Sequence, residues 1–293
     1  MPIKQFITPK NLDELYKYGY SIIPNCLTNQ KAVQLAEDAS SLCSNNHDIV
    51  STHDHWQGLY NPFYLSRNFL ETIYNPFILS YVEHCLGKEA NPILNMQALF
   101  NSSRVEEYRR DEIINNALLR KNHRLSNSNI HTDQLFNNPF DSKSPLQICF
   151  LIALNPFNYK TGGTAFIKSS HLLPKPRPQD IEKLALSKND LLVPELEPGD
   201  AVVFWGHTWH LAMPNTITNE RWGLSIRYTH WAIKTMFDYS DYIIPEDISN
   251  LEKSLLDSLL GKGSITPNAL EERKFTVTKS TNITSENIQF LID

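Results

Sequence analysis

The segment EPGDAVVFWGHTWHLAMPNTITNERWGLSIRYTHW, residues 197–231, contains two stretches with the composition of β-strands. The first, AVVFW, follows a Pro-Gly-Asp turn signal, and the second, WGLSIRYTHW, is rich in aromatic and β-branched side chains. Two histidines, His207 and His210, lie between the stretches, and Arg221 immediately precedes the second. The segment therefore predicts two strands with metal-ligating and charged side chains where they meet.

Three earlier stretches also have strand character. In NPILNMQALFN the side chains are expected to alternate between two faces, because successive residues of an extended chain point in opposite directions. One face would carry Ile93, Asn95, Gln97, Leu99 and Asn101, and the other Leu94, Met96, Ala98 and Phe100. Turn signals separate the stretches. The predicted strands are residues 91–101, 146–154, 163–168, 201–205 and 222–231.

Helical spacing of apolar residues predicts helices on either side of these strands. The first is expected to end at Gly19, and Thr28 is predicted to cap the start of the second, which follows the strand-like YSIIP. One helix is predicted over residues 10–18, and a second begins after Thr28. Three more are predicted over about 75–86, 104–124 and 245–261. Residues 47–69 are rich in aromatic residues and histidines and are predicted to form an irregular surface loop.

Helices followed by several antiparallel strands with long connections are typical of a helix-flanked double-stranded jelly roll. The predicted fold is thus mainly β, a cupin-like double-stranded β-helix with flanking helices. No internal repeat or low-complexity linker divides the chain, so residues 1–293 are predicted to form a single domain. Its parts would be a helical N-terminal part over about 8–88, a jelly-roll core over about 90–235 and a C-terminal helical extension over about 236–293.

The composition excludes several classes of function. Of 293 residues, 41% are hydrophobic and 20% are charged, as in ordinary globular proteins, and the net charge of −5 argues against a partner such as nucleic acid or an anionic membrane. The N-terminal residues lack the apolar core of a signal peptide, and no stretch approaches 18 apolar residues. The four cysteines form no Cys-x-x-Cys pair, which favours free thiols. We therefore expect a cytoplasmic protein without a membrane span; the sequence carries no signal for an oligomeric state.

A candidate for a metal site appears in SNIHTDQLF, residues 128–136. His131 and Asp133 are two positions apart, so their side chains would lie on the same face of an extended chain. With one more histidine they would give two imidazoles and one carboxylate, the ligand set of non-haem Fe(II) oxygenases. The remaining metal positions can take a bidentate 2-oxo acid and O₂. An arginine is the natural partner for the second carboxylate of such a co-substrate.

The chain resembles the phytanoyl-CoA dioxygenase family of Fe(II)/2-oxoglutarate oxygenases. LDELYKYGYSIIPNCLTNQKAVQLAEDA resembles the opening helix, strand and helix of the family, and HTD resembles its His-x-Asp motif. YKTGGTAFIKSSH and PGDAVVFWGHTWHLAMPNTITNER resemble two later family segments. The sequence departs from the family pattern at Lys168-Ser169, where the family often has Pro-Gly. The resemblance implies that His131, Asp133 and His210 bind iron and that Arg221 holds the C5 carboxylate of 2-oxoglutarate.

The function implied by this resemblance is that of an Fe(II)- and 2-oxoglutarate-dependent dioxygenase, with O₂ as the other co-substrate. Such an enzyme would hydroxylate a small-molecule metabolite and release succinate and CO₂. Related halogenases carry Gly or Ala at the position of Asp133, so the carboxylate favours hydroxylation, or another oxidation such as desaturation, over halogenation. Two other classes remain open: a zinc-type metal-dependent hydrolase using the same ligands, and a jelly-roll binding protein without catalysis.

Several residue assignments have competitors. His207 could replace His210 as the third ligand, although a place in the pocket lining or at the end of the strand fits it better. Arg227 shares a strand face with Arg221 and could hold 2-oxoglutarate instead, or contact substrate. The resemblance makes Gln97 and Asn101 candidates for contacts to 2-oxoglutarate or substrate; the alternative is simple hydrogen bonding between strands.

Further residues are candidates for substrate contacts. Trp56 and Phe136 could line a substrate pocket, as could Tyr60 and Phe63, which could equally pack on the core. The His53/His55 pair has no identifiable third ligand. In residues 104–124, basic residues such as Arg109 and Arg110 outnumber the acidic ones, and Ile113, Ile114, Ala117 and Leu118 form an apolar stripe. A helix there is expected at the barrel mouth, where it could attract an anionic substrate. The alternative, which base rates favour, is a solvated helix with ion pairs between residues four apart.

Overall fold

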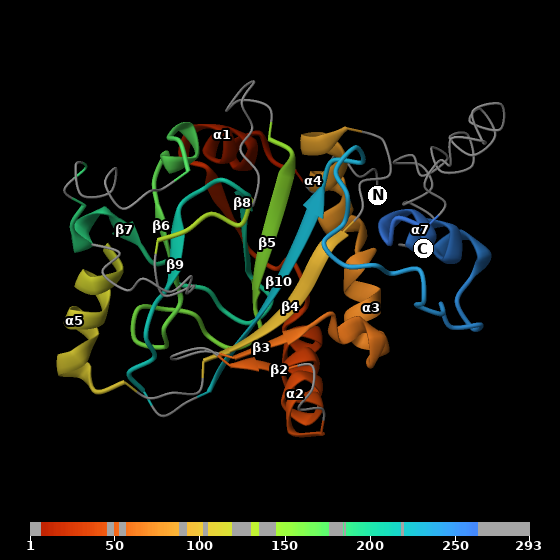
Figure 1. Cartoon of the computed structure of the whole chain (residues 1–293), viewed down its shortest axis with the longest axis horizontal. Coiled ribbons are helices and arrows are strands. Elements are labelled where there is room, and N and C mark those ends of the chain that lie inside the picture. The colour runs from red at the N-terminus through yellow and green to blue at the C-terminus, as the bar shows by residue number, and fades with distance from the viewer. Residues whose placement is uncertain are drawn as a thin grey trace.

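A computed structural model describes residues 7–45, 50–52, 57–87, 93–101, 105–118, 130–134, 145–175, 184, 186–217 and 220–262. Its strands form two antiparallel sheets (Figure 1). The large sheet has the strand order β1 (Tyr20–Ile23), β8 (Ala201–Trp205), β5 (Gln147–Ala153), β10 (Arg221–Thr229), β4 (Ile93–Asn101), β3 (Gln57–Tyr60) and β2 (Val50–Thr52). The small sheet has the order β7 (Leu191–Leu192), β6 (Thr164–Ile167) and β9 (His210–Ala212). The predicted class, a mainly β jelly roll with flanking helices, is confirmed.

Alternation along the strands of the large sheet gives it two different faces. In β5, Ile148, Phe150 and Ile152 pack in the core that includes the helices, whereas Cys149 and Leu151 pack toward β6 and the small sheet. Met96 and Ala98 of β4 and Leu224 and Ile226 of β10 likewise face the helices. The opposite, inner face therefore carries Gln97 and Asn95 of β4, which lie opposite Ser225 and Arg227 of β10.

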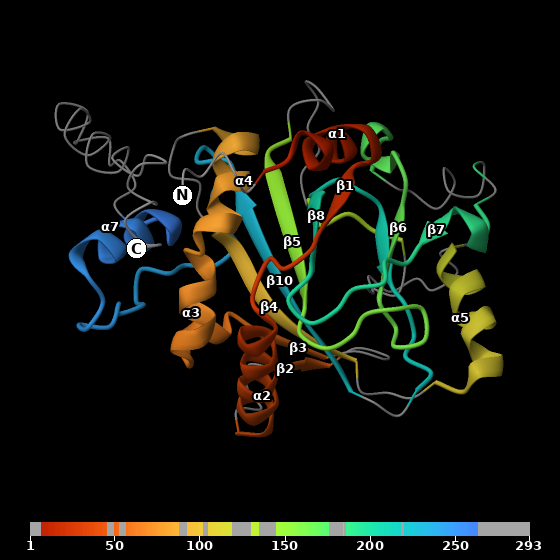
Figure 2. The same ribbon diagram turned by 180° about the vertical axis from the view of Figure 1, so that it is seen from behind.

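Four helices accompany the outer face: α1 (Pro9–Tyr18), α2 (Asn29–Asn45), α3 (Arg67–Ile73) and α4 (Pro76–Leu86) (Figure 2). Their ends follow the sequence signals. The Thr8 side chain accepts a hydrogen bond from Asn11 N at the start of α1, and Gly19, with φ of 88°, ends it. The side chain of Asn75 accepts from Phe77 N and Ile78 N at the start of α4. Among the described residues, no helix combines the length and apolar character needed to cross a bilayer.

The prediction of a surface loop over residues 47–69 is wrong for its described part. That part contains β2, β3, a short 3-10 helix (Pro62–Tyr64) and the start of α3. Leu59, Phe63 and Phe69 are each at most 2% exposed. The difference arises because β3 pairs with β4, with Gly58 opposite Leu99, and this long-range pairing leaves no local periodicity. His53, His55 and Trp56 lie outside the described residues.

Helix α5 (Glu107–Leu118) does not lie where the sequence suggested. Ile114, Ala117 and Leu118 pack against Ala165 and Leu211, which belong to the small sheet. Neighbouring residues on these strands, Phe166 and His210, point to the opposite side and contact each other. The helix therefore covers the outer surface of the small sheet (Figure 1). The expectation that it lies at the barrel mouth is wrong, since a local apolar stripe does not specify which surface it covers.

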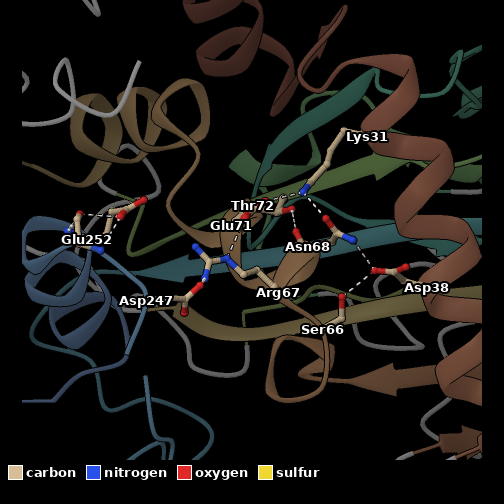
Figure 3. Close-up of polar contacts among 10 residues, drawn as sticks. Lys31, Asp38, Ser66, Arg67, Asn68, Glu71, Thr72, Asp247 and Glu252 are labelled. Carbon is tan, nitrogen blue, oxygen red and sulfur yellow. Dashed lines mark hydrogen bonds and ion pairs between the residues drawn. The ribbon is translucent and has the colours of Figure 1, made fainter. Parts of the chain in front are cut away.

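A polar network connects α2, α3 and the segment before α7 (Asn250–Leu259) (Figure 3). Lys31 Nζ donates to Asn68 Oδ1 at 2.8 Å and to Glu71 Oε2 at 2.7 Å. Arg67 Nε donates to Glu71 Oε1 at 3.1 Å, and Arg67 also pairs with Asp247. Such partly exposed pairs contribute little stability individually, but together these contacts orient the segment before α7 on α3.

Candidate metal centre

His131 and Asp133 lie in the short described segment 130–134, and His210 is the first residue of β9. His131 and His210 form an antiparallel bridge, with each backbone N–H donating to the other carbonyl at 3.0 Å. The sequence places His131 and Asp133 on one face locally. The bridge adds His210, 79 positions after His131 in the chain, to the same place.

Ligand atoms of His131, Asp133 and His210 all lie within 4.8 Å of one another. His210 Nε2 is 3.7 Å from Asp133 Oδ1, and His131 Nε2 is 4.0 Å from the same oxygen. Within the described part of the chain, this is the one group of three or more His, Cys, Asp or Glu side chains that could hold a metal ion. Two imidazoles and a carboxylate around one point fit a divalent transition metal.

The orientation of His210 is fixed by its surroundings. Its Nδ1 lies 2.9 Å from the Thr208 carbonyl oxygen, which can only accept, so Nδ1 carries the proton. Its Nε2 is then left with a lone pair directed toward Asp133. The ring is further held by Phe166 and Phe204, whose centroids are 5.8 Å and 5.1 Å from it. The imidazole is thus preorganised as a metal ligand.

The electrostatics of the cluster favour the metal-binding protonation states. Burial by itself would raise the pKa of Asp133, but Arg227, His210 and His131 outweigh it, and the pKa of this carboxyl lies below its ordinary value. Burial lowers the pKa of His210, opposed by Asp133. At neutral pH Asp133 is therefore a carboxylate and His210 a neutral imidazole. These are the forms that bind a metal without first losing a proton.

Arg221 is a buried cation with no acidic partner among the described residues. Its exposed fraction is 3%, and it lies opposite Asn101 on β4. Its Nη2 donates to the Gly162 carbonyl at 2.5 Å, and its guanidinium lies 4.5 Å from the centre of the Phe157 ring. Its Nε has no hydrogen-bond partner in the part of the chain that the structure describes. Burial lowers its pKa to about 9, so it is still charged at neutral pH. A buried, unpaired guanidinium is costly, which points to an anionic ligand.

Arg227 occupies a different position. Its Nη2 is 2.9 Å from Asp133 Oδ1 and 3.3 Å from Gln97 Oε1. Arg227 therefore contacts the metal cluster directly, whereas Arg221 contacts the loop before β6.

His207, the other histidine of the segment, does not belong to the cluster; its ring is half-buried, 6.1 Å from that of His171.

The remaining candidate residues fall into three groups. Gln97 and Asn101 are buried on the inner face of β4, where Asn101 Nδ2 donates to the Met213 carbonyl at 3.0 Å and its Oδ1 has no partner within the described ranges. Phe63 packs in the core on the helix side, so core packing explains it. Tyr60 is half-buried, with its ring 5.9 Å from that of Phe237. Trp56 and Phe136 lie outside the described residues.

Sequence reasoning missed two contributors to the site. Cys149 lies opposite Arg227 on β5 and hydrogen-bonds to Asp133, and burial together with the Asp133 charge raises the pKa of its thiol. Thr208 supplies the carbonyl that fixes His210. Alternation in LQICFLIAL could have placed Cys149 on the inner face. The contact to the Thr208 carbonyl could not have been predicted, because every residue has a backbone carbonyl.

Comparisons with known proteins agree with this geometry. A family model described as "Phytanoyl-CoA dioxygenase (PhyH)" matches residues 15–222. No curated protein matches the chain. Among solved structures, the chain is similar to SnoN, a non-haem α-ketoglutarate-dependent epimerase of nogalamycin biosynthesis (TM-score 0.54, 16% identity, covering 82% of this chain and 90% of that one). It is also similar to the carbocyclase SnoK of the same biosynthesis (0.58, 13%, 78% and 86%).

A further similar structure is HygX from Streptomyces hygroscopicus, with nickel and 2-oxoglutarate bound (TM-score 0.57, 12% identity, covering 80% of this chain and 93% of that one). At these identities the likeness to the solved structures establishes the shared fold.

Proposed function

The chain belongs to the phytanoyl-CoA dioxygenase family of Fe(II)- and 2-oxoglutarate-dependent oxygenases, and from this premise we propose that it hydroxylates a small-molecule metabolite with release of succinate and CO₂. The resemblance drawn from the sequence motifs is thereby confirmed. The chain is a non-haem iron enzyme that uses 2-oxoglutarate. The observation that carries the proposal is the His131, Asp133 and His210 cluster, together with a buried arginine on the neighbouring strand.

Each residue has a defined part in the proposed reaction. His131, Asp133 and His210 would hold the iron, with Thr208 and the two phenylalanine rings fixing His210. Bound iron supplies the activation of O₂ that is coupled to decarboxylation of the 2-oxo acid. Arg221 would bind the C5 carboxylate of 2-oxoglutarate, while Gln97 and Asn101 offer polar groups on the inner face of β4. Asp133 would occupy the metal position that a halogenase leaves open for chloride, which supports hydroxylation.

The two competing classes explain less of the site. A zinc hydrolase could use the same three ligands, and a binding protein could retain them without catalysis. Neither gives a reason for Arg221, a charged group with 3% exposure and no acidic partner among the described residues. A dicarboxylate co-substrate would supply that partner.

Succinate release by the purified protein tests the proposal. We expect release that requires both Fe(II) and 2-oxoglutarate and that increases with a substrate found by screening metabolites. The product of that stimulated reaction should carry one more oxygen atom than the substrate, as measured by mass spectrometry. Zn(II)-loaded protein is the matched control and should release no succinate. Hydrolysis of a test ester or amide by the zinc form, without succinate from the iron form, would favour the hydrolase.

Replacing Arg221 with glutamine is expected to raise the Michaelis constant for 2-oxoglutarate about thirtyfold, since a charged, partly desolvated contact is worth about 2 kcal/mol. The Michaelis constant for the substrate should change far less. Initial rates of succinate release at varied 2-oxoglutarate measure the effect, with Arg109→Gln on the exposed face of α5 as control. If Arg227→Gln raised this constant and Arg221→Gln did not, Arg227 would be the 2-oxoglutarate partner.

A further inference from the structure

A row of three polar side chains crosses the inner face of the large sheet beside Asp133. Asn95 of β4 and Cys149 of β5 are both in register with Arg227 of β10, which lies between them. Paired residues on adjacent strands carry their side chains on the same face, about 5 Å apart. Because Arg227 contacts Asp133, the row borders the metal cluster directly.

Two members of this row have unused hydrogen-bonding groups. Asn95 is 1% exposed, and neither its Nδ2 nor its Oδ1 has a partner among the described residues. The Nε of Arg227 is also buried, and no described residue accepts a hydrogen bond from it. Buried amides and guanidinium groups are nearly always hydrogen-bonded in folded proteins, because leaving them unpaired costs free energy. Unused donors at adjacent positions therefore indicate a ligand that accepts hydrogen bonds.

The balance of charge indicates that this ligand is an anion. Asp133 of the cluster contributes one buried carboxylate, and β10 contributes two guanidinium groups, Arg221 at 3% exposure and Arg227 with a side chain that is 12% exposed. A bound Fe(II) dication and a 2-oxoglutarate dianion cancel each other, and Asp133 offsets one arginine. One positive charge is left, which is costly in a buried site. A ligand with a single negative charge would neutralise it.

The position of Arg227 fits a substrate group more closely than a co-substrate group. Arg221 and Arg227 are six residues apart on one strand, a separation of about 20 Å along an extended chain. At the end of β10 that carries Arg221, the inner face is shielded from solvent: Arg221 is 3% exposed and Asn101 is 0% exposed. Nearer the other end of β10, the side chains of Arg227 and His131 are 12% and 21% exposed. A molecule from solvent would meet Arg227 first.

We propose that Asn95 and Arg227 form a subsite, next to the metal, for a carboxylate carried by the substrate. This inference rests on the proposed function, because it assigns the substrate of that same site to the monocarboxylates. Metal binding would strengthen the subsite, since a metal ion shares the charge of Asp133 and leaves Arg227 available to a second anion. We therefore assign the binding of an anionic substrate to Arg227, and not to Arg109 and Arg110 of the outer helix α5.

Acetate is the probe for this subsite, and its methyl protons report on proximity to a paramagnetic metal. Protein loaded with Mn(II) and saturated with 2-oxoglutarate is titrated with acetate, and the relaxation rate of the methyl protons is measured by NMR. We expect a saturable increase in relaxation for the wild-type protein, and none for the Zn(II)-loaded protein, which is diamagnetic. In Arg227→Gln the acetate affinity should fall at least tenfold, and in Asn95→Ala about threefold or more. Arg109→Gln should bind acetate as the wild type does.

Three outcomes would overturn the proposal. Unchanged acetate affinity in both Arg227→Gln and Asn95→Ala would mean that acetate binds elsewhere, including directly on the metal. Displacement of 2-oxoglutarate by acetate would assign the subsite to the C1 carboxylate of the co-substrate. No saturable relaxation in the wild-type protein would mean that the subsite does not take a carboxylate. Asn95→Ala removes no charge, so it remains informative if thermal unfolding shows that Arg227→Gln is not folded.

Failure of the subsite and failure of the proposed function give different results. If wild-type protein with Fe(II) releases no succinate from 2-oxoglutarate under any condition, the oxygenase assignment fails whatever acetate does. If succinate is released but acetate binding ignores Arg227 and Asn95, the subsite alone is wrong.

Discussion

Replacing Asp133 with alanine is expected to abolish 2-oxoglutarate-dependent turnover. The change removes the anionic member of the His131, Asp133 and His210 cluster, and two neutral imidazoles bind a dication far more weakly than the complete set. It also leaves Arg227 without the carboxylate that lies 2.9 Å from its Nη2. Removing one partner of a buried ion pair costs about 3 kcal/mol or more, so the melting temperature should fall as well.

Succinate release and the metal content of the purified variant measure this prediction. Asp133→Asn is the matched control, because it keeps the side-chain volume and an acceptor for Arg227 while losing the charge. We expect it to lose turnover as completely as the alanine variant but to unfold at a higher temperature. Either variant retaining wild-type metal content and turnover, without an added carboxylate, would remove Asp133 from the ligand set.

Replacing His210 with alanine is expected to eliminate iron binding, and with it turnover, whereas replacing His207 should leave iron binding intact. His210 Nε2 points to Asp133 and its Nδ1 is committed to the Thr208 carbonyl, so its geometry is that of a ligand. The ring of His207 lies outside the cluster, in the direction of His171. Metal titration of the two variants, followed by Co(II) absorption, separates them.

Loss of folding must be distinguished from loss of a ligand, because the His210 ring also packs against the rings of Phe166 and Phe204. Thermal unfolding in the presence of a chelator compares the metal-free proteins. His210→Ala should then be only moderately less stable than the metal-free wild type, and added metal should stabilise the wild type and His207→Ala alone. Metal binding by His210→Ala together with its loss in His207→Ala would assign the third ligand to His207.

The type of oxidation depends on more than the ligand set. SnoN is an epimerase and SnoK a carbocyclase, so the fold shared with this chain accommodates different outcomes in those proteins. What distinguishes outcomes is the position of the substrate relative to the metal. In this chain that position would follow from the groups beside Asp133, which include Asn95 Nδ2 and Arg227 Nε, two buried donors without a partner among the described residues. Identification of the reaction product therefore tests hydroxylation directly.

Much of the fold and the candidate site could be predicted from the sequence, because short-range patterns encode them. Alternation in NPILNMQALFN identified β4 and placed Asn95, Gln97 and Asn101 on one face. The turn residues and caps located the end of α1 and the start of α2, where Gly19 ends the first helix and Thr28 Oγ1 accepts a hydrogen bond from Lys31 N. The order and spacing of the His-x-Asp motif, His210 and Arg221 indicated the family, which the match over residues 15–222 establishes. Each of these signals lies within a few residues or at a fixed interval along the chain.

Only the tertiary structure decided which distant segments meet. It brought Arg227 onto Asp133, placed Asn95 beside Arg227, included His210 rather than His207 in the cluster, and put α5 on the outer surface of the small sheet. It also showed that the described part of residues 47–69 forms β2, β3, a short 3-10 helix and the start of α3. The physical reason is that alternation fixes the face on which a side chain lies, but not the strand beside it. Register between strands depends on the packing of the whole core, to which residues far apart in the sequence contribute together.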